Sequence, residues 1–210
     1  HEKEFAKMTY LDGVRAKIKD DPPLIYHPSG TDQNYTLREA KLIHKRYVES
    51  LPEDKQVLLS RYTIHDFAIK VVGVGSVGTL CGISLLMSAT GEPIFLQFKE
   101  ARQSVLEPNV KIKGKYKHQG ERIVMGQKLM QSASDMFLGW TNDDRGRFFY
   151  IRQLRDAKIK PVIEIMKAEN MADYAKACGW ALARAHARSG DPSILSGYIG
   201  KNDEFANAIS

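Results

Sequence analysis

The apolar residues near the start of the chain recur at spacings of three and four, the pattern of one apolar face on an α-helix. This pattern predicts a helix over residues 5–18, ended by Asp21-Pro22-Pro23, because proline lacks a backbone donor and restricts the residue before it. A second helix is expected from Thr36, where Glu39 completes a capping box, and a third over residues 53–60. Residues 1–60 are therefore predicted to form a helical segment. The apolar face of its first helix would carry Phe5, Met8, Leu11, Val14 and Ile18.

The middle of the chain is rich in β-branched and aromatic residues, which favour strands. Strand patterns are interrupted there by turn signals and by one helical pattern. Residues 61–156 are therefore predicted to form an α+β domain, an antiparallel sheet with one helix. The predicted elements are, in order, strands at 62–74 and 94–98, a helix at 121–132, and strands at 136–140 and 147–154.

The last third of the chain, residues 157–210, returns to helical periodicity. A long helix is expected to run to about Arg188 and to stop at Ser189-Gly190-Asp191-Pro192, since glycine and proline end helices. Its buried face is predicted to carry Met171, Tyr174, Ala175, Cys178, Leu182 and Ala185.

Composition and charge exclude several classes without selecting a function. Hydrophobic residues make up 43% and charged residues 27% of the chain, as in folded globular domains, and no apolar run is long enough to span a membrane. The net charge of +6 is mild and clustered base-stacking aromatics are absent, so no nucleic-acid partner is expected. Cys81 and Cys178 are interpreted as a reduced intracellular pair, which suits a cytoplasmic protein. The six histidines lack metal-ligand spacing, so no metal site is predicted.

One motif carries candidate chemistry: the glycine loop Gly73-Val74-Gly75-Ser76-Val77-Gly78. Glycines spaced in this way let the backbone approach phosphate oxygens, which a Cβ would obstruct, and expose amides as donors. The motif therefore predicts a nucleotide-phosphate site that includes Gly73, Gly75, Ser76 and Gly78. By itself it does not choose a fold.

A Rossmann unit is the first fold that could carry this loop. Residues 79–89 would then be the helix that holds the pyrophosphate at its N-terminus, and residues 94–98 the second strand. Glu100, 22 residues after Gly78, would be the ribose-binding carboxylate of an NAD-dependent oxidoreductase.

The N-lobe of a protein kinase is the second such fold, with the glycines at the tip of a β-hairpin over the phosphates of ATP. Residues 79–87 would then be the returning strand, Lys99 the phosphate-binding lysine, and Glu121 its helical partner. Gln153 and Leu154, with Arg155, would form the hinge beside the adenine. Gly82 and the weak helix formers around it disfavour a helix after the loop, so the kinase-like interpretation is preferred.

Further blocks of sequence carry a resemblance to a known family. They include Lys70-Val71-Val72-Gly73-Val74-Gly75, Phe95-Leu96-Gln97-Phe98-Lys99-Glu100-Ala101-Arg102, Tyr150-Ile151-Arg152-Gln153-Leu154-Arg155-Asp156 and Cys178-Gly179-Trp180-Ala181-Leu182-Ala183-Arg184-Ala185-His186. In these blocks the chain resembles the bacterial domain-of-unknown-function family 2252, over roughly residues 62 to 205. That family resembles kinase-like phosphotransferases such as the aminoglycoside and choline kinases. The resemblance implies ATP and Mg²⁺ as cofactors, and catalytic motifs that precede the glycine loop.

Those catalytic motifs are not found in this chain. Asp191, after His186, is the nearest candidate base, but Ser196 stands where a metal-binding asparagine would be needed. We therefore expect the ATP-binding part of a phosphotransferase that acts on a small molecule, with its catalytic residues in a missing portion of the same polypeptide. A non-catalytic nucleotide-binding or assembly module is the alternative. Residues 157–210 would be the helical start of a C-lobe.

Overall fold

A computed structural model of the 210-residue chain describes residues 5, 7–28, 37–71, 73, 78–110, 114–154 and 161–209. The chain divides into two units. The first comprises His1–Val124 and Asp135–Lys158, and the second comprises Met125–Ser134 and Ile159–Ser210. The predicted segment 1–60 and most of the predicted domain 61–156 thus lie in one unit.

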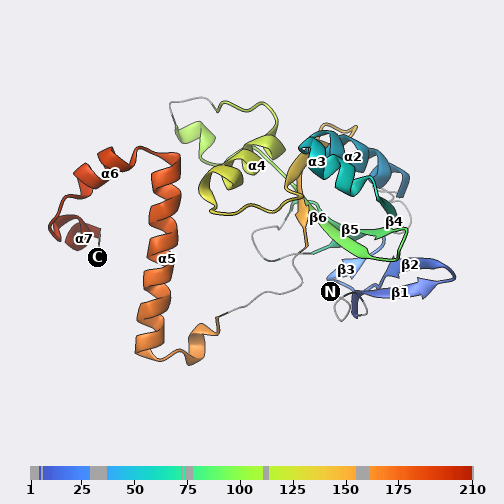
Figure 1. Ribbon diagram of the computed structural model, residues 1–210, viewed down its shortest axis with the longest axis horizontal. Helices are drawn as coiled ribbons and strands as arrows, with labels where there is room; N and C mark the ends of the chain where they lie inside the picture. Colours follow the sequence, from blue (N-terminus) through green and yellow to red (C-terminus); the bar gives the residue numbers. More distant parts are fainter. Residues whose placement is uncertain are drawn as a thin grey trace. The chain divides into compact units, whose positions relative to one another are not determined.

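A six-stranded antiparallel sheet organises the first unit (Figure 1). The α+β class with an antiparallel sheet is therefore confirmed. Strands lie near those predicted at 62–74, 94–98 and 147–154, whereas the one predicted at 136–140 begins only at Gly139. The spatial order of the strands is β3-β4-β5-β6-β8-β7. Their bounds are β3 Ile25–Tyr26, β4 Tyr62–Lys70, β5 Cys81–Ser88, β6 Pro93–Glu100, β7 Gly139–Asn142 and β8 Phe148–Gln153.

Helices α2 (Leu37–Glu49) and α3 (Glu53–Leu59) lie near the predicted positions, and α2 covers one face of the sheet. The alternation of side chains along each strand sends every second residue toward this helix. Further elements are helix α4 (Gln119–Met130) and the short 3₁₀ helices η3 (Glu107–Asn109) and η4 (Ile163–Ile165). The main core beneath α2 includes Ala40, Tyr47, Phe67, Leu96, Phe98, Phe149 and Ile151.

The opposite face of the sheet is covered by a hairpin of β1 (Thr9–Asp12) and β2 (Arg15–Ile18), where a helix over 5–18 was predicted (Figure 1). That prediction is wrong beyond Met8, since of the described residues in this stretch only Phe5, Lys7 and Met8 are helical. Gly13 has φ 62 and occupies the first central position of a two-residue turn, the conformation that joins antiparallel strands tightly. A second core lies beneath the hairpin and includes Ala16, Ile18, Ile25, Ala68, Ile83, Leu85 and Phe95.

A histidine bridged by two carboxylates ties the segment after β2 to the sheet. His27 Nδ1 lies 2.7 Å from Asp20 Oδ1, and His27 Nε2 lies 3.0 Å from Asp66 Oδ2. The backbone N–H of Ile18 donates to the same Asp66 oxygen at 2.8 Å. Asp66 lies inside β4, beside an irregularity in the pairing with β5.

These contacts shift the ionisation of both partners. The hydrogen bond to Asp66, followed by the one to Asp20, raises the pKa of His27 against the opposing effect of burial. Burial alone would raise the pKa of Asp66, but the hydrogen bonds from His27 and Ile18 outweigh it and lower that pKa. The bridge is therefore strongest where His27 is protonated and Asp66 is ionised.

Replacing His27 by glutamine is expected to destabilise the protein most below pH 6.5. A raised histidine pKa gives stability that is complete below its unfolded value and is lost as the pH rises through the folded value. Hydrogen bonds to charged groups are the stronger ones, so the loss should be about 2 kcal/mol at pH 6 and about 1 kcal/mol at pH 8.5. Urea unfolding at both pH values measures the difference. An equal loss at both would show that the imidazole charge does not contribute.

Three helices form the C-terminal part of the second unit: α5 (Ala168–Ser189), α6 (Pro192–Ile199) and α7 (Glu204–Ile209). The end of α5 is as predicted, and the Asp191 side chain caps α6 by accepting from the Ser193 and Ile194 N–H groups. The predicted buried face of α5 is wrong for this chain, because no α5 residue is buried. In the described part of the chain, no helix is long and apolar enough to cross a membrane.

Candidate functional site

The glycine loop joins two antiparallel strands. Ile69 of β4 pairs with Gly82 of β5, so the chain reverses its direction between them. Residues 81–88, which a Rossmann unit requires as a helix, form strand β5 instead. The Rossmann interpretation of the loop is therefore wrong, and with it the role of Glu100 as a ribose-binding carboxylate, because that fold needs a parallel strand–helix–strand unit.

Two of the four loop positions predicted to meet phosphate can be placed. Gly78 has φ 74, a left-handed conformation that glycine adopts without strain. The φ angle of Gly73 lies outside this left-handed region, so its backbone conformation does not require glycine. Gly75 and Ser76 lie outside the described residues. The described end of the loop is residues 78–80, which we call its C-terminal arm.

Lys99 lies beside the end of the glycine loop. In β6 it is paired with Cys81 of β5 on one side and with Tyr150 of β8 on the other. Its neighbour Phe98 faces the core beneath α2, so Lys99 faces the opposite side of the sheet. The predicted proximity of the lysine to the loop follows from this register.

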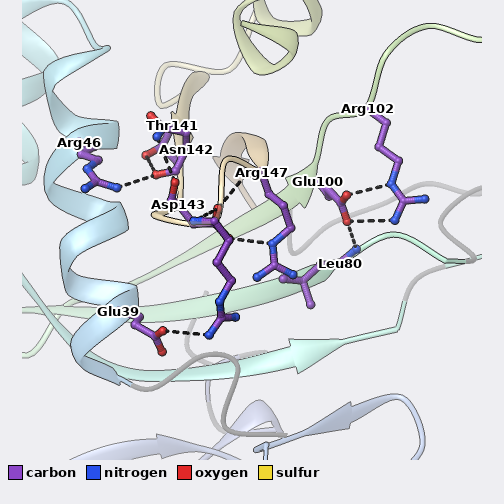
Figure 2. A network of polar contacts seen from close by, with 10 residues as sticks. Glu39, Arg46, Leu80, Glu100, Arg102, Thr141, Asn142, Asp143 and Arg147 are labelled. Carbon is purple, nitrogen blue, oxygen red and sulfur yellow. Dashed lines mark hydrogen bonds and ion pairs between the residues drawn. The ribbon is translucent and has the colours of Figure 1, made fainter.

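Glu100 and Arg102 hold the C-terminal arm of the loop (Figure 2). Glu100 Oε2 accepts from the Leu80 N–H at 2.9 Å, and Arg102 Nε donates to Glu100 Oε1 at 2.8 Å. Arg102 also donates to the Gly78 carbonyl. Burial alone would raise the pKa of Glu100, but the hydrogen bonds from Arg102 and Leu80 outweigh it and lower that pKa, so the carboxylate is ionised at neutral pH.

Sequence reasoning did not assign this role to either residue. The sequence Glu100-Ala101-Arg102 did carry a signal for it. It places an acid and an arginine two residues apart at the end of a strand that borders the loop, which is compatible with an ion pair at that point.

Glu121 lies in the first turn of α4, close to where a helical partner for Lys99 was predicted. Its backbone N–H donates to His118 Nδ1 at 3.2 Å. Its carboxylate makes no ion pair with any residue that the structure describes, so the structure does not contain the predicted contact with Lys99. Strand β6, which carries Lys99, precedes helix α4, which carries Glu121, as expected. An ion pair between the two side chains is not observed.

The predicted hinge residues, Gln153 and Leu154, use their backbone donors within the protein. The Gln153 N–H donates to Asp135 Oδ2 at 2.8 Å, and the Leu154 N–H donates to the Phe95 carbonyl at 2.8 Å. Asp135 also accepts from the Phe137 N–H. An adenine contact at these two positions would therefore have to use a carbonyl or a side chain. Arg155 lies outside the described residues.

Comparison with known proteins places the chain in a family. Residues 1–210 match the profile of a family described as an uncharacterized protein conserved in bacteria, domain-of-unknown-function family 2252. The chain belongs to this family. No curated protein and no solved structure matches the chain. The family assignment expected from the sequence blocks is therefore confirmed, whereas no structural relative supports the likeness to kinases.

A second polar cluster of this family 2252 protein orders the turn between β7 and β8 (Figure 2). Asp143, only 6% exposed, accepts from the Arg147 N–H and Nε and from the Arg145 N–H. Arg145 and Arg46 extend the cluster to Glu39 and Asp144. These contacts order the β7–β8 turn and join it to α2, so we assign the cluster a structural role.

A small apolar cavity lies between α2 and the sheet in the same unit of the family 2252 protein. Its lining includes Ile43, His44, Phe67 and Phe98. Burial lowers the pKa of His44 to about 4, so this imidazole is neutral at physiological pH. With neither a charged side chain nor a metal ligand set, the cavity is a poor match for a phosphate.

The implied Mg²⁺ finds no ligand set in the part of the family 2252 protein that the structure describes. No group of three or more His, Cys, Asp or Glu side chains there is arranged to hold a metal ion. Magnesium sites are built from carboxylates together with substrate phosphates. The residues that the structure describes therefore do not form a site that fits the ion.

Proposed function

We propose that this protein binds the phosphates of ATP at the glycine loop, as the nucleotide-binding part of a kinase-like phosphotransferase acting on a small molecule. One observation carries the proposal. The glycine loop closes an antiparallel hairpin whose returning strand, β5, runs directly beside Lys99. A loop of this kind can cover phosphates while the lysine neutralises them from the next strand.

The order of elements supports the same proposal. A glycine hairpin is followed by the lysine strand β6, then by α4 and by the two strands β7 and β8. This sequence of elements is the one in which kinase N-lobes present their glycine loop, lysine and helical glutamate. Catalytic aspartates and the Mg²⁺ ligands would come from a further portion of the polypeptide.

A non-catalytic nucleotide-binding module is the second candidate. The missing metal ligand set among the described residues favours it. Calorimetric titration with ATP, with and without Mg²⁺, followed by a phosphotransfer assay on the full-length polypeptide, separates the two. Binding with turnover supports the phosphotransferase, and binding without turnover supports the module. Absence of ATP binding would contradict both.

Replacing Lys99 by methionine is expected to weaken ATP binding while leaving the fold intact. Methionine fills a similar volume but removes the positive charge, and a lost charged contact to phosphate should lower the affinity about ten- to a hundredfold. Titration calorimetry measures the affinity, and thermal unfolding checks the fold. Lys41→Met, at an exposed position of α2, is the matched control and should bind as the parent does. Unchanged affinity in an intact Lys99 variant would refute the assignment.

A further inference from the structure

We infer that Glu100 and Arg102 form a latch that positions the C-terminal arm of the glycine loop for a nucleotide phosphate. Neither residue is assigned to the phosphate contact itself, so both are positioning residues. The functional part of this inference rests on the proposed nucleotide binding, whereas the latch itself is carried by contacts within the chain.

The latch begins where the sheet ladder ends. Cys81 and Lys99 form the end pair of the β5–β6 ladder. The adjacent residues, Leu80 and Glu100, continue the pairing through one backbone bond and one side-chain bond. The Glu100 N–H donates to the Leu80 carbonyl at 2.8 Å, and the Leu80 N–H donates to the Glu100 side chain at 2.9 Å. The carboxylate thus replaces a backbone carbonyl and fixes the chain where it leaves the strand.

Arg102 fixes a second point of the arm, Gly78, two residues before Leu80. Its guanidinium donates to the Glu100 carboxylate (Figure 2). It also donates to the Gly78 carbonyl. The Glu100 side chain is 11% exposed, so the ion pair is poorly screened on the carboxylate side. The Arg102 carbonyl in turn accepts from Arg122 Nη2 at 3.0 Å, which links the arginine's own backbone to α4.

Holding the Gly78 carbonyl determines the orientation of the following amide. In a planar trans peptide, the C=O of one residue and the N–H of the next point in opposite directions. With the Gly78 carbonyl held by Arg102, the Thr79 N–H is directed away from Arg102. Gly78 reaches this arrangement at φ 74, where other residues would be strained.

A loop that is oriented before its ligand arrives gives up less conformational freedom on binding. The latch should therefore matter for ligands that carry phosphates and not for the nucleoside alone. Loosening it should raise the cost of ordering the loop around the phosphates while leaving contacts to the base unchanged. This difference separates a positioning role from a general loss of folding.

The test uses Arg102→Gln, since the Arg102 side chain is 59% exposed and its loss should not unfold the protein. Hydrogen–deuterium exchange should show the amides of residues 78–80 exchanging at least fivefold faster than in the parent. ATP affinity should fall five- to twentyfold and adenosine affinity less than twofold. Arg102→Lys, which keeps one charged donor, should recover part of the ATP affinity. Asp12→Asn, which breaks the exposed Lys17–Asp12 ion pair of the β1–β2 hairpin, is the control and should change neither measurement.

Unchanged exchange at residues 78–80 in Arg102→Gln would overturn the latch, whatever the ligand data show. Faster exchange with equal losses for ATP and adenosine would overturn its positioning role. If the parent protein binds no ATP, the proposed function fails, but the exchange experiment still decides whether the latch exists. The two failures are therefore distinguishable.

Discussion

Replacing Gly120 by alanine is expected to lower the free energy of unfolding by about 3 kcal/mol, the upper range for overpacking a tight site. A Cβ at Gly120 would lie 2.2 Å from the Phe149 carbonyl oxygen and 2.9 Å from its carbonyl carbon. Phe149 belongs to β8, which is paired with β6 on one side and β7 on the other. Its backbone cannot move away without disturbing both pairings, so α4 must shift instead.

Gly126 of the same helix provides the matched control. No atom would lie within 4 Å of a Cβ there, so Gly126→Ala should raise the stability by up to about 1 kcal/mol, the ordinary helical preference for alanine. Urea unfolding of both variants measures the two effects, which should have opposite signs. A stabilising Gly120→Ala variant would show that α4 does not pack against β8 as the structure has it.

Strands β4, β6 and β8 could be predicted from sequence because their signals are local, whereas the two-residue strand β3 was not predicted. Residues 62–70 and 93–100 combine β-branched and aromatic residues with turn signals. Gly82, which argued against a helix after the glycine loop, has a packing reason in the structure. A Cβ at this position would lie 2.1 Å from the Phe98 ring and 2.8 Å from the Ala68 carbonyl. The glycine that disfavours a helix is thus also required by the neighbouring strands.

The first predicted helix failed because its periodicity was accidental. Leu11 and Val14 belong to the supposed apolar face, yet they are 74% and 96% exposed. Gly13 was the competing signal: with Val14 it forms the two-residue turn between the two short strands, and glycine at positive φ in such a turn favours a hairpin. The α5 face failed for another reason. Periodicity predicts which side of a helix is apolar, but it does not supply the element that would cover that side.

The candidate site was predictable only as far as it follows the order of elements. Lys99 reaches the glycine loop through strand register, which the predicted hairpin already implied. The engaged amide of Gln153 depends on Asp135, a side chain 18 residues away in sequence, and that of Leu154 depends on the Phe95 carbonyl in β6. The hold of Arg102 on Gly78 spans 24 residues. Contacts of this range depend on tertiary packing. The local pattern Glu100-Ala101-Arg102 indicates an ion pair, but it does not indicate which backbone groups the pair will contact.

Replacing Asp143 by alanine should lower the free energy of unfolding by about 3 to 4 kcal/mol, the cost of removing one partner of a buried ion pair. The side chain accepts from the Arg145 N–H and from the Arg147 N–H and Nε, and its loss would remove the Asp143 carboxylate from the Arg147 guanidinium. Asp144→Ala is the matched control one residue away. Asp144 is 64% exposed and pairs with Arg46 at the surface, so its loss should cost less than about 1 kcal/mol. Urea unfolding compares the two variants. Equal losses of stability in the two alanine variants would show that burial of Asp143 does not strengthen its interactions. Asp143→Asn retains an acceptor for the hydrogen bonds but removes the charge, so an intermediate loss in this variant would separate the two contributions.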